Sequence, residues 1–336
     1  MHPPCQLKSN RNPLTMNFIP DSLPAQINPK PMMKSLLFLL AIALPLHGQA
    51  PGTSIFEQSR EGLRTEQGAI SDQTKKLHRD KKMLSLEATV KLLEEPAMSP
   101  VKLPTPNTKK LTPTGIAEAA RASNYRVGWA YLCNNCDNWH INLAGGYAIT
   151  DNGVIATCSH VVNTSRKKMR DGSLIAVDST GKVHPVTAII ADHKEIDGAL
   201  LKIDAKTVPL PLSDHVSPGD SAFCFSRPLK QGDYFSQGIV NRFFWKSEDR
   251  GDDPNSLQSL GALKLNVSTR WAPGSSGSAV LDSFGNAIGH VSTISTMGNR
   301  GNRSDKDKGG RTLITLHTAT PARAMKALAA APPVSN

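Results

Sequence analysis

From about residue 125 onward, the chain consists of short apolar runs separated by turn signals, and this pattern constrains the fold more than any other feature. The runs are rich in β-branched and aromatic residues, for example RVGWAYL at 126–132, HPVTAIIA at 184–191 and SAFCFS at 221–226. Each run is long enough for a strand and too short for a typical helix. Many short strands at even spacing predict an all-β fold, either a sandwich or a pair of barrels. A clear helix is expected only at the far end, in TPARAMKALAAA at 320–331.

The chain before this β region is polar, charged and rich in proline. Apolar residues recur every seven positions at Phe56, Leu63, Ile70, Leu77 and Leu84, but the second apolar position of each heptad is polar, which disfavours a coiled coil. Short helices are expected in KKMLSLEATVKLLEEP and GIAEAARASN, with a Pro-rich linker between them. We expect residues 51–113 to form a loosely structured arm, pro-segment or docking segment, and residues 114–331 to form the compact domain.

Residues 32–50 have the layout of a secretory signal peptide. Lys34 provides the positive region, the apolar stretch extends from Leu36 to Leu46, and Gly48-Gln49-Ala50 fits a cleavage site. The apolar stretch is shorter than the roughly 20 residues that span a bilayer. We therefore expect a secreted or periplasmic protein that begins near Pro51 and has no stable membrane span after cleavage. Residues 1–31, rich in Pro and Asn, are interpreted as an over-extended start.

The formal net charge of +11 raises the question of nucleic-acid binding. Lys and Arg are dispersed along the chain, and aromatic residues make up only 5% of it. Dispersed charge gives weak, non-specific attraction to anions, and few aromatic rings are available to stack on bases. Nucleic acid is therefore not expected as a partner.

Three stretches of the β region carry residue types that nucleophilic catalysis requires. They are IATCSHVV with His160, EIDGALLKI with Asp197, and APGSSGSAV with Ser276. A serine hydroxyl becomes a good nucleophile when a histidine takes its proton and a carboxylate orients that histidine. Taken alone, the Gly/Ser-rich stretch also fits an ordinary hairpin entry. The three stretches together favour catalysis.

These stretches resemble the signature blocks of trypsin-like serine proteases, especially the bacterial HtrA and glutamyl endopeptidase branch. The resemblance extends from about Val127 to Leu328, and the chain order His, Asp, Ser is that of this fold. It implies a chymotrypsin-like double β-barrel with a short C-terminal helix, a protein or peptide substrate, and no metal or other cofactor. No PDZ domain is expected. Ser278 and Ala279 depart from the family pattern, which usually has Gly and Pro there.

Carried over by position, the resemblance implies that Ser276 is the nucleophile, His160 the general base and acid, and Asp197 the residue that orients His160. The backbone N–H groups of Gly274, Ser275 and Ser276 are expected to form the oxyanion hole.

Other residues could contribute to specificity or stability. Arg270 is expected near the primary specificity pocket, where it would favour acidic side chains, although a solvated loop arginine is the simpler alternative. His290 could line the same pocket or pack in the core.

The cysteines raise a separate question. Cys133 and Cys136 form a CxxC motif for which a disulfide is favoured. The alternatives are a zinc site with His140, which lacks a clear fourth ligand, a redox motif, and free thiols. Cys158 and Cys224 lie in apolar runs and are expected to be buried thiols.

Two functions therefore remain. The leading one is an exported serine endopeptidase that works through an acyl-enzyme. The alternative is a catalytically silent binding or scaffold protein that keeps the protease fold and uses residues 51–113 to dock a partner.

Overall fold

The computed structural model describes residues 58–97, 99–247, 253–298 and 312–330. The expected signal peptide at residues 32–50 and the expected over-extended start at 1–31 lie outside the described residues.

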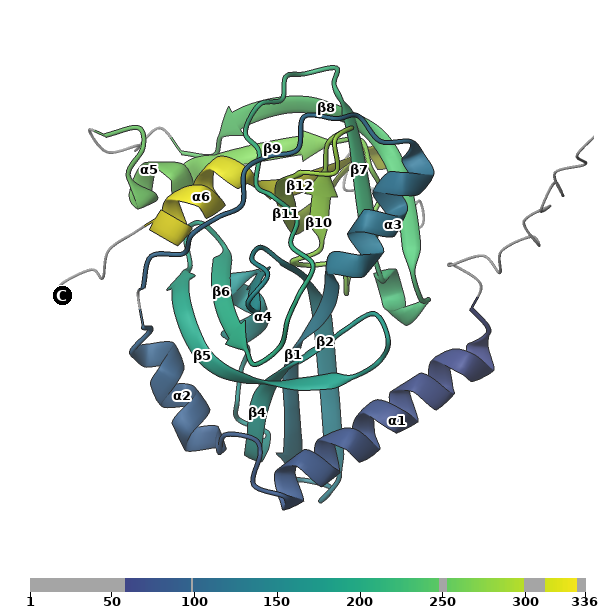
Figure 1. Cartoon of the computed structure of the whole chain (residues 1–336), viewed down its shortest axis with the longest axis vertical. Coiled ribbons are helices and arrows are strands. Elements are labelled where there is room, and N and C mark those ends of the chain that lie inside the picture. Colours follow the sequence, from purple (N-terminus) through teal and green to yellow (C-terminus); the bar gives the residue numbers. More distant parts are fainter. Residues whose placement is uncertain (1–57, 98, 248–252, 299–311, 331–336) are drawn as a thin grey trace, which may run out of the picture. The chain divides into compact units, whose positions relative to one another are not determined.

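The described strands form two closed six-stranded antiparallel barrels, shown in Figure 1. In the first barrel the order around the sheet is β1 (Asn124–Cys133), β2 (Trp139–Ala148), β3 (Val154–Thr157), β6 (Gly198–Ile203), β5 (Val183–His193) and β4 (Met169–Val177). In the second barrel the order is β10 (Ala279–Leu281), β11 (Ala287–Gly298), β12 (Thr312–Pro321), β9 (Leu263–Val267), β8 (Tyr234–Trp245) and β7 (Ser221–Ser226). This is the chymotrypsin-like double barrel, so the expected fold class is confirmed.

The apolar runs became strands because each barrel buries one face of every strand. Ile155, Leu174 and Leu201 belong to the core of the first barrel, and Val240, Leu265 and Val280 to that of the second. Closing each sheet on itself pairs all of its strands and leaves no exposed edge.

A third apolar cluster joins the two barrels. It contains Tyr147 and Leu200 from the first barrel, Phe223 and Leu281 from the second, and Met325 from the C-terminal helix α6 (Ala322–Ala330). The two barrels and α6 therefore share buried apolar surface, and the turns that carry the site residues are positioned by both barrels.

The expectation of a loosely structured arm is wrong for residues 60–79, whereas the short helix expected in KKMLSLEATVKLLEEP is found. Two helices form there, α1 (Arg60–Arg79) and α2 (Leu86–Glu94), capped by the hydroxyls of Ser59 and Ser85. They lie against the first barrel in Figure 1. Ile70 and Leu77, one heptad apart, supply this contact. Ile70 is fully buried against Ala130, Ile175, Val177 and Val183, and Leu77 packs on the same cluster.

The Pro-rich linker between α2 and α3 is extended and bonded to both barrels. Ala97 N–H donates to Ile189 O in the first barrel, Val101 N–H to Ala329 O of α6, and Leu111 N–H to Ser283 O beside β10. The expected short helix follows as α3 (Pro113–Ser123), with Thr112 as its N-cap. These contacts explain why residues 60–123 pack as part of the compact unit.

Three short helical segments complete the described structure: α4 (Ser159–Val162), the 3₁₀ segment η1 (Pro228–Lys230) and α5 (Leu257–Ala262). Within the described ranges, no helix combines the length and the apolar character that crossing a bilayer requires.

Candidate active site

His160 and Asp197 come from two turns of the first barrel and are in direct contact. β3 ends at Thr157, and His160 is the second residue of α4. Asp197 ends the turn between β5 and β6 in a left-handed conformation, with φ of 61°. The His160 Nδ1 lies 2.9 Å from Asp197 Oδ1. An ionised carboxylate only accepts hydrogen bonds, so Nδ1 carries the proton and Nε2 is left to accept one from a hydroxyl.

The Asp197 carboxylate is held from both barrels. Ser292 of β11 donates its hydroxyl to Oδ2 over 2.6 Å, and the His160 backbone N–H donates to Oδ1 over 3.2 Å. Burial alone would raise the pKa of Asp197, but the hydrogen bonds from His160 and Ser292 outweigh it and lower that pKa below its ordinary value. The same hydrogen bond raises the pKa of His160. His160 is thus a stronger base than a free imidazole.

The two neighbouring serines differ in accessibility. Ser275 is fully buried and donates its hydroxyl to the Ser226 hydroxyl over 3.1 Å. Ser276 is partly exposed in the turn before β10. The expected assignment of Ser276 rather than Ser275 as the reacting group therefore fits the environments of the two hydroxyls.

The Ser276 turn packs against the segment that leads to His160. Gly277 N–H donates to Val291 O over 2.7 Å, and Cys158 Sγ contacts the same oxygen at 3.0 Å. A side chain on Gly277 would collide with Thr157 and Gly145, and its φ of 83° is unfavourable for other residues. Gly277 therefore permits the close approach that brings Ser276 next to the histidine segment.

Two backbone amides beside Ser276 are available for a substrate oxygen. Among the described residues, no hydrogen-bond acceptor is recorded for the N–H groups of Gly274 and Ser276. The Pro273 carbonyl accepts a hydrogen bond from the Leu229 N–H over 2.8 Å. This carbonyl and the Gly274 N–H belong to the same trans peptide unit and point in opposite directions, so the Gly274 N–H points away from Leu229. The expectation for Ser275 is wrong, because its N–H donates to Ala272 O over 3.1 Å. An oxyanion hole at this turn would therefore use Gly274 and Ser276.

In the described part of the chain, the His160 ring is hydrogen-bonded to Asp197 and makes no hydrogen bond to Ser276. Such bonds are often long without substrate and tighten in the reacting complex.

His290 does not line an open pocket, which corrects one of its expected roles. The ring is fully buried, and its Nε2 lies 2.9 Å from Asp197 O. Burial lowers the pKa of His290, so the ring is neutral and donates its Nε2 proton to that carbonyl. His290 therefore fixes the backbone of Asp197 from the protein interior, and its side chain is not exposed to a substrate.

Arg270 is exposed and lines a cavity of about 860 Å³ in the second barrel, together with Trp271 and His317. Its backbone N–H and carbonyl both bond to the Ser236 hydroxyl. These bonds involve only the backbone of Arg270, and the role of its exposed side chain in specificity stays a prediction.

The expected Cys133–Cys136 disulfide is absent from the structure, where both residues are free thiols at the turn between β1 and β2. The Cys136 Sγ faces His140 Nε2 at 3.1 Å, while Cys133 Sγ accepts from Asn135 N–H. The ligand atoms of Cys133, Cys136 and His140 all lie within 4.8 Å of one another. Cys158 and Cys224 are buried thiols, as expected.

The candidate site lies within a stretch that matches a known protein family. Residues 144–289 match the family model of the trypsin-like peptidase domain. This segment contains His160, Asp197 and Ser276 and runs through parts of both barrels, so the candidate site lies in the part of the chain that is similar to this family.

Among solved structures, the chain is similar to "HtrA-type protease AlgW with decapeptide", with 18% identity and a TM-score of 0.45. The alignment covers 64% of this chain and 66% of that one, just under two thirds of its length. No curated protein matches the chain.

Sequence reasoning did not identify Ser292 as a partner of Asp197. Ser292 lies 95 residues further along the chain, in a run of Ser and Thr residues that all suit a strand. No local signal distinguishes it from Thr293 or Ser295, because its role depends on how the second barrel meets the first.

Proposed function

We propose that the protein is a serine endopeptidase that hydrolyses peptide bonds through an acyl-enzyme. The observation that carries the proposal is the hydrogen-bonded pair of His160 and Asp197. The turn of the partly exposed Ser276 supports it, because that turn packs against Thr157 and Cys158, just before His160. A base of raised pKa, a hydroxyl on a tight turn and two free amides are the parts that acyl transfer requires.

In the proposed reaction, His160 Nε2 takes the Ser276 hydroxyl proton while Oγ attacks the substrate carbonyl carbon. Asp197 stabilises the resulting imidazolium, and the Gly274 and Ser276 N–H groups stabilise the oxyanion. His160 then gives its proton to the leaving amine, which leaves an ester on Ser276. A water molecule, activated by the same histidine, hydrolyses this ester and regenerates the hydroxyl.

Mutagenesis with unfolded casein as substrate tests the proposal. Ser276→Ala and His160→Ala should each remove nearly all turnover, by a factor on the order of 10⁶ in kcat, and the double variant should be hardly worse. Ser275→Ala is the matched control, because it removes a neighbouring hydroxyl and leaves the relay intact. Wild-type protein that does not cut casein would favour the catalytically silent scaffold. Turnover that survives Ser276→Ala would show that Ser276 is not the nucleophile.

We further propose that the protein is exported, on the strength of the signal-like segment at residues 32–50. A peptidase that acts on unfolded protein is compatible with a secreted or periplasmic location.

A further inference from the structure

A cavity of about 490 Å³ lies between α1 and the two barrels, next to the proposed oxyanion hole. Its walls come from the first half of α1, from β1 and β2, and from the loop at 227–232. Gly274 and Ser278 complete the lining; these two residues lie two positions before and two positions after Ser276 in the chain. Gly145, another lining residue, donates its N–H to Ser276 O over 2.7 Å. The cavity therefore adjoins the turn that carries the proposed nucleophile.

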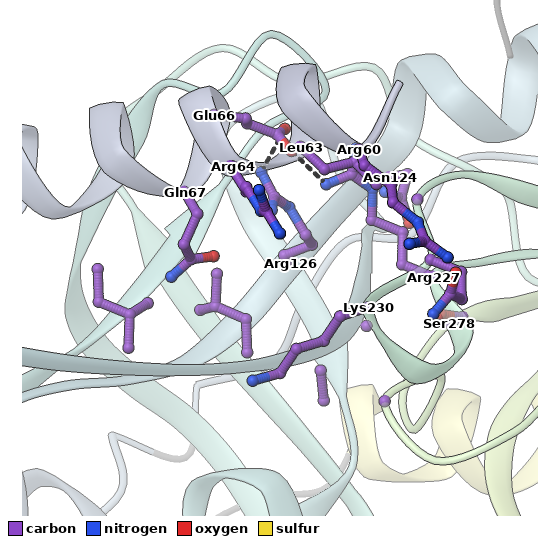
Figure 2. A pocket seen from close by; sticks show the side chains of 17 residues that line it. Arg60, Leu63, Arg64, Glu66, Gln67, Asn124, Arg126, Arg227, Lys230 and Ser278 are labelled. Carbon is purple, nitrogen blue, oxygen red and sulfur yellow. Dashed lines mark hydrogen bonds and ion pairs between the residues drawn. The ribbon is translucent and has the colours of Figure 1, made fainter. Parts of the chain in front are cut away.

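The side chains around this cavity are strongly cationic. The lining contains one acidic residue, Glu66, and five cationic ones, which are Arg60, Arg64, Arg126, Arg227 and Lys230. Figure 2 shows Arg60 and Arg64 on α1, with Arg126, Arg227 and Lys230 on the segments that face this helix. An excess of one charge around a partly enclosed space attracts ligands of the opposite charge.

Glu66 shows how this site holds a carboxylate. Its Oε1 lies 2.7 Å from Arg126 Nη2, and its Oε2 lies 2.8 Å from Arg227 Nη1 (Figure 2). The two arginine side chains are only 12% and 14% exposed. Asp233 also pairs with Arg227 from outside the cavity lining. The two buried arginines are thus already neutralised.

The remaining three cations have no such partner. Within the residues that the structure describes, Arg60, Arg64 and Lys230 form no ion pair, and all three are exposed. Burial, and to a smaller extent the neighbouring Arg227, lowers the pKa of Arg126 to about 10.

The loop that carries Lys230 is tied to the proposed oxyanion hole. Leu229 and Lys230 both adopt left-handed conformations, with φ of 52° and 60°, which non-glycine residues rarely do. The Leu229 N–H donates to Pro273 O, the carbonyl of the peptide unit that contains the Gly274 N–H. The unusual loop backbone thus places Lys230 at the cavity and positions the proposed oxyanion donor at the same time.

We propose that this cavity is a substrate subsite that binds an acidic side chain of the peptide next to the scissile bond, with Arg64 and Lys230 as the residues that recognise it. The inference rests on the proposed endopeptidase function and adds a substrate class to it. Charge-assisted hydrogen bonds to a carboxylate in a partly enclosed site are strong enough to give about a tenfold preference.

Paired quenched-fluorescent peptides test the subsite. The two members of each pair differ only by Glu or Gln at one position, and the position is scanned on both sides of the scissile bond. Wild-type protein should cleave the Glu peptide about tenfold faster in kcat/KM at one position, and this ratio should fall to about one in Arg64→Gln/Lys230→Gln. The matched control is Arg79→Gln/Lys82→Gln, which removes the same charge from exposed residues outside the cavity and should keep the ratio.

A binding measurement separates failure of the subsite from failure of the proposed function. In the Ser276→Ala background, fluorescence anisotropy should show tighter binding of the Glu peptide than of the Gln peptide, and Arg64→Gln/Lys230→Gln should abolish the difference. Equal binding of both peptides, or a preference that survives this double substitution, would overturn the subsite. Absence of cleavage together with the expected binding difference would refute the endopeptidase and leave the acidic-peptide site standing.

Discussion

At the residue scale, Asp197 connects the groups from both barrels. It accepts hydrogen bonds from the His160 ring and from Ser292, while His290 bonds to its backbone carbonyl. These contacts fix an aspartate whose left-handed backbone would otherwise be unfavourable. The orientation and the basicity of His160 therefore depend on the same carboxylate.

The pKa of His160 provides a test at this scale. The hydrogen bond to Asp197 raises that pKa, whereas burial lowers it. In Asp197→Asn the carboxylate is lost and burial remains, so the pKa of His160 should fall. An NMR titration of the His160 ring between about pH 5 and 8 measures this without any need for activity. An unchanged pKa would contradict the direct pairing of the two side chains.

The same pairing sets the sign of the pH dependence of activity. General-base catalysis needs neutral His160, so wild-type kcat/KM should rise as the pH increases through the raised pKa of His160. Asp197→Asn should shift this rise to lower pH and reduce kcat by a factor on the order of 10⁴, because the histidine loses its correct tautomer.

At the element scale, α1 forms part of the folded domain and also one wall of the cationic cavity. Its buried Ile70 packs against the first barrel, and Glu66 of the same helix bridges Arg126 and Arg227. Through these contacts the helix couples the first barrel to the loop beside the Ser276 turn.

The packing of α1 on the first barrel predicts how substitutions in this helix change the free energy of unfolding. Ile70→Ala removes a fully buried side chain and should lower the free energy of unfolding by about 2–5 kcal/mol. Lys75→Ala, on the exposed side of the same helix, should change it by no more than about 0.5 kcal/mol. Denaturant unfolding of the purified protein compares the two. Equal, small effects would mean that α1 does not pack on the barrel in solution.

The strands were far easier to predict from the sequence than α1. Runs such as HPVTAIIA and SAFCFS carry their own signal, because β-branched and aromatic residues recur between turns. Helix α1 is polar and contains Gly62 and Gly68, so its local propensity is weak. Its stability depends on tertiary contacts such as that of Glu66 with Arg227, 161 residues away, which no local pattern encodes.

At the scale of the whole molecule, the candidate site combines both barrels. His160 and Asp197 come from the first, and Ser276 and Ser292 come from the second. The motifs predicted that His160, Asp197 and Ser276 belong to one site, but the groups that hold and surround these residues depend on how the barrels meet. The sequence therefore did not show that Ser275 is buried, that its N–H is already occupied, or that His290 lies beneath Asp197.

The proposed export concerns the chain as a whole as well. The order of the charged, apolar and cleavage segments from Lys34 to Ala50 predicts a mature protein that begins near Pro51. N-terminal sequencing of protein collected from outside the cytoplasm measures this directly. A mature chain that still carries residues 1–31 would contradict both the cleavage site and the interpretation of that segment as an over-extended start.

The most direct test of the central claim is covalent labelling with a fluorophosphonate, followed by mass spectrometry of the labelled peptide. Such probes react with a serine hydroxyl that a neighbouring base activates and leave ordinary serines unmodified. If Ser276 is the nucleophile, each chain should carry one adduct, on Ser276. The adduct should be lost in Ser276→Ala and His160→Ala and kept in Ser275→Ala. Absence of any adduct on folded wild-type protein, or an adduct on Ser275, would contradict this assignment.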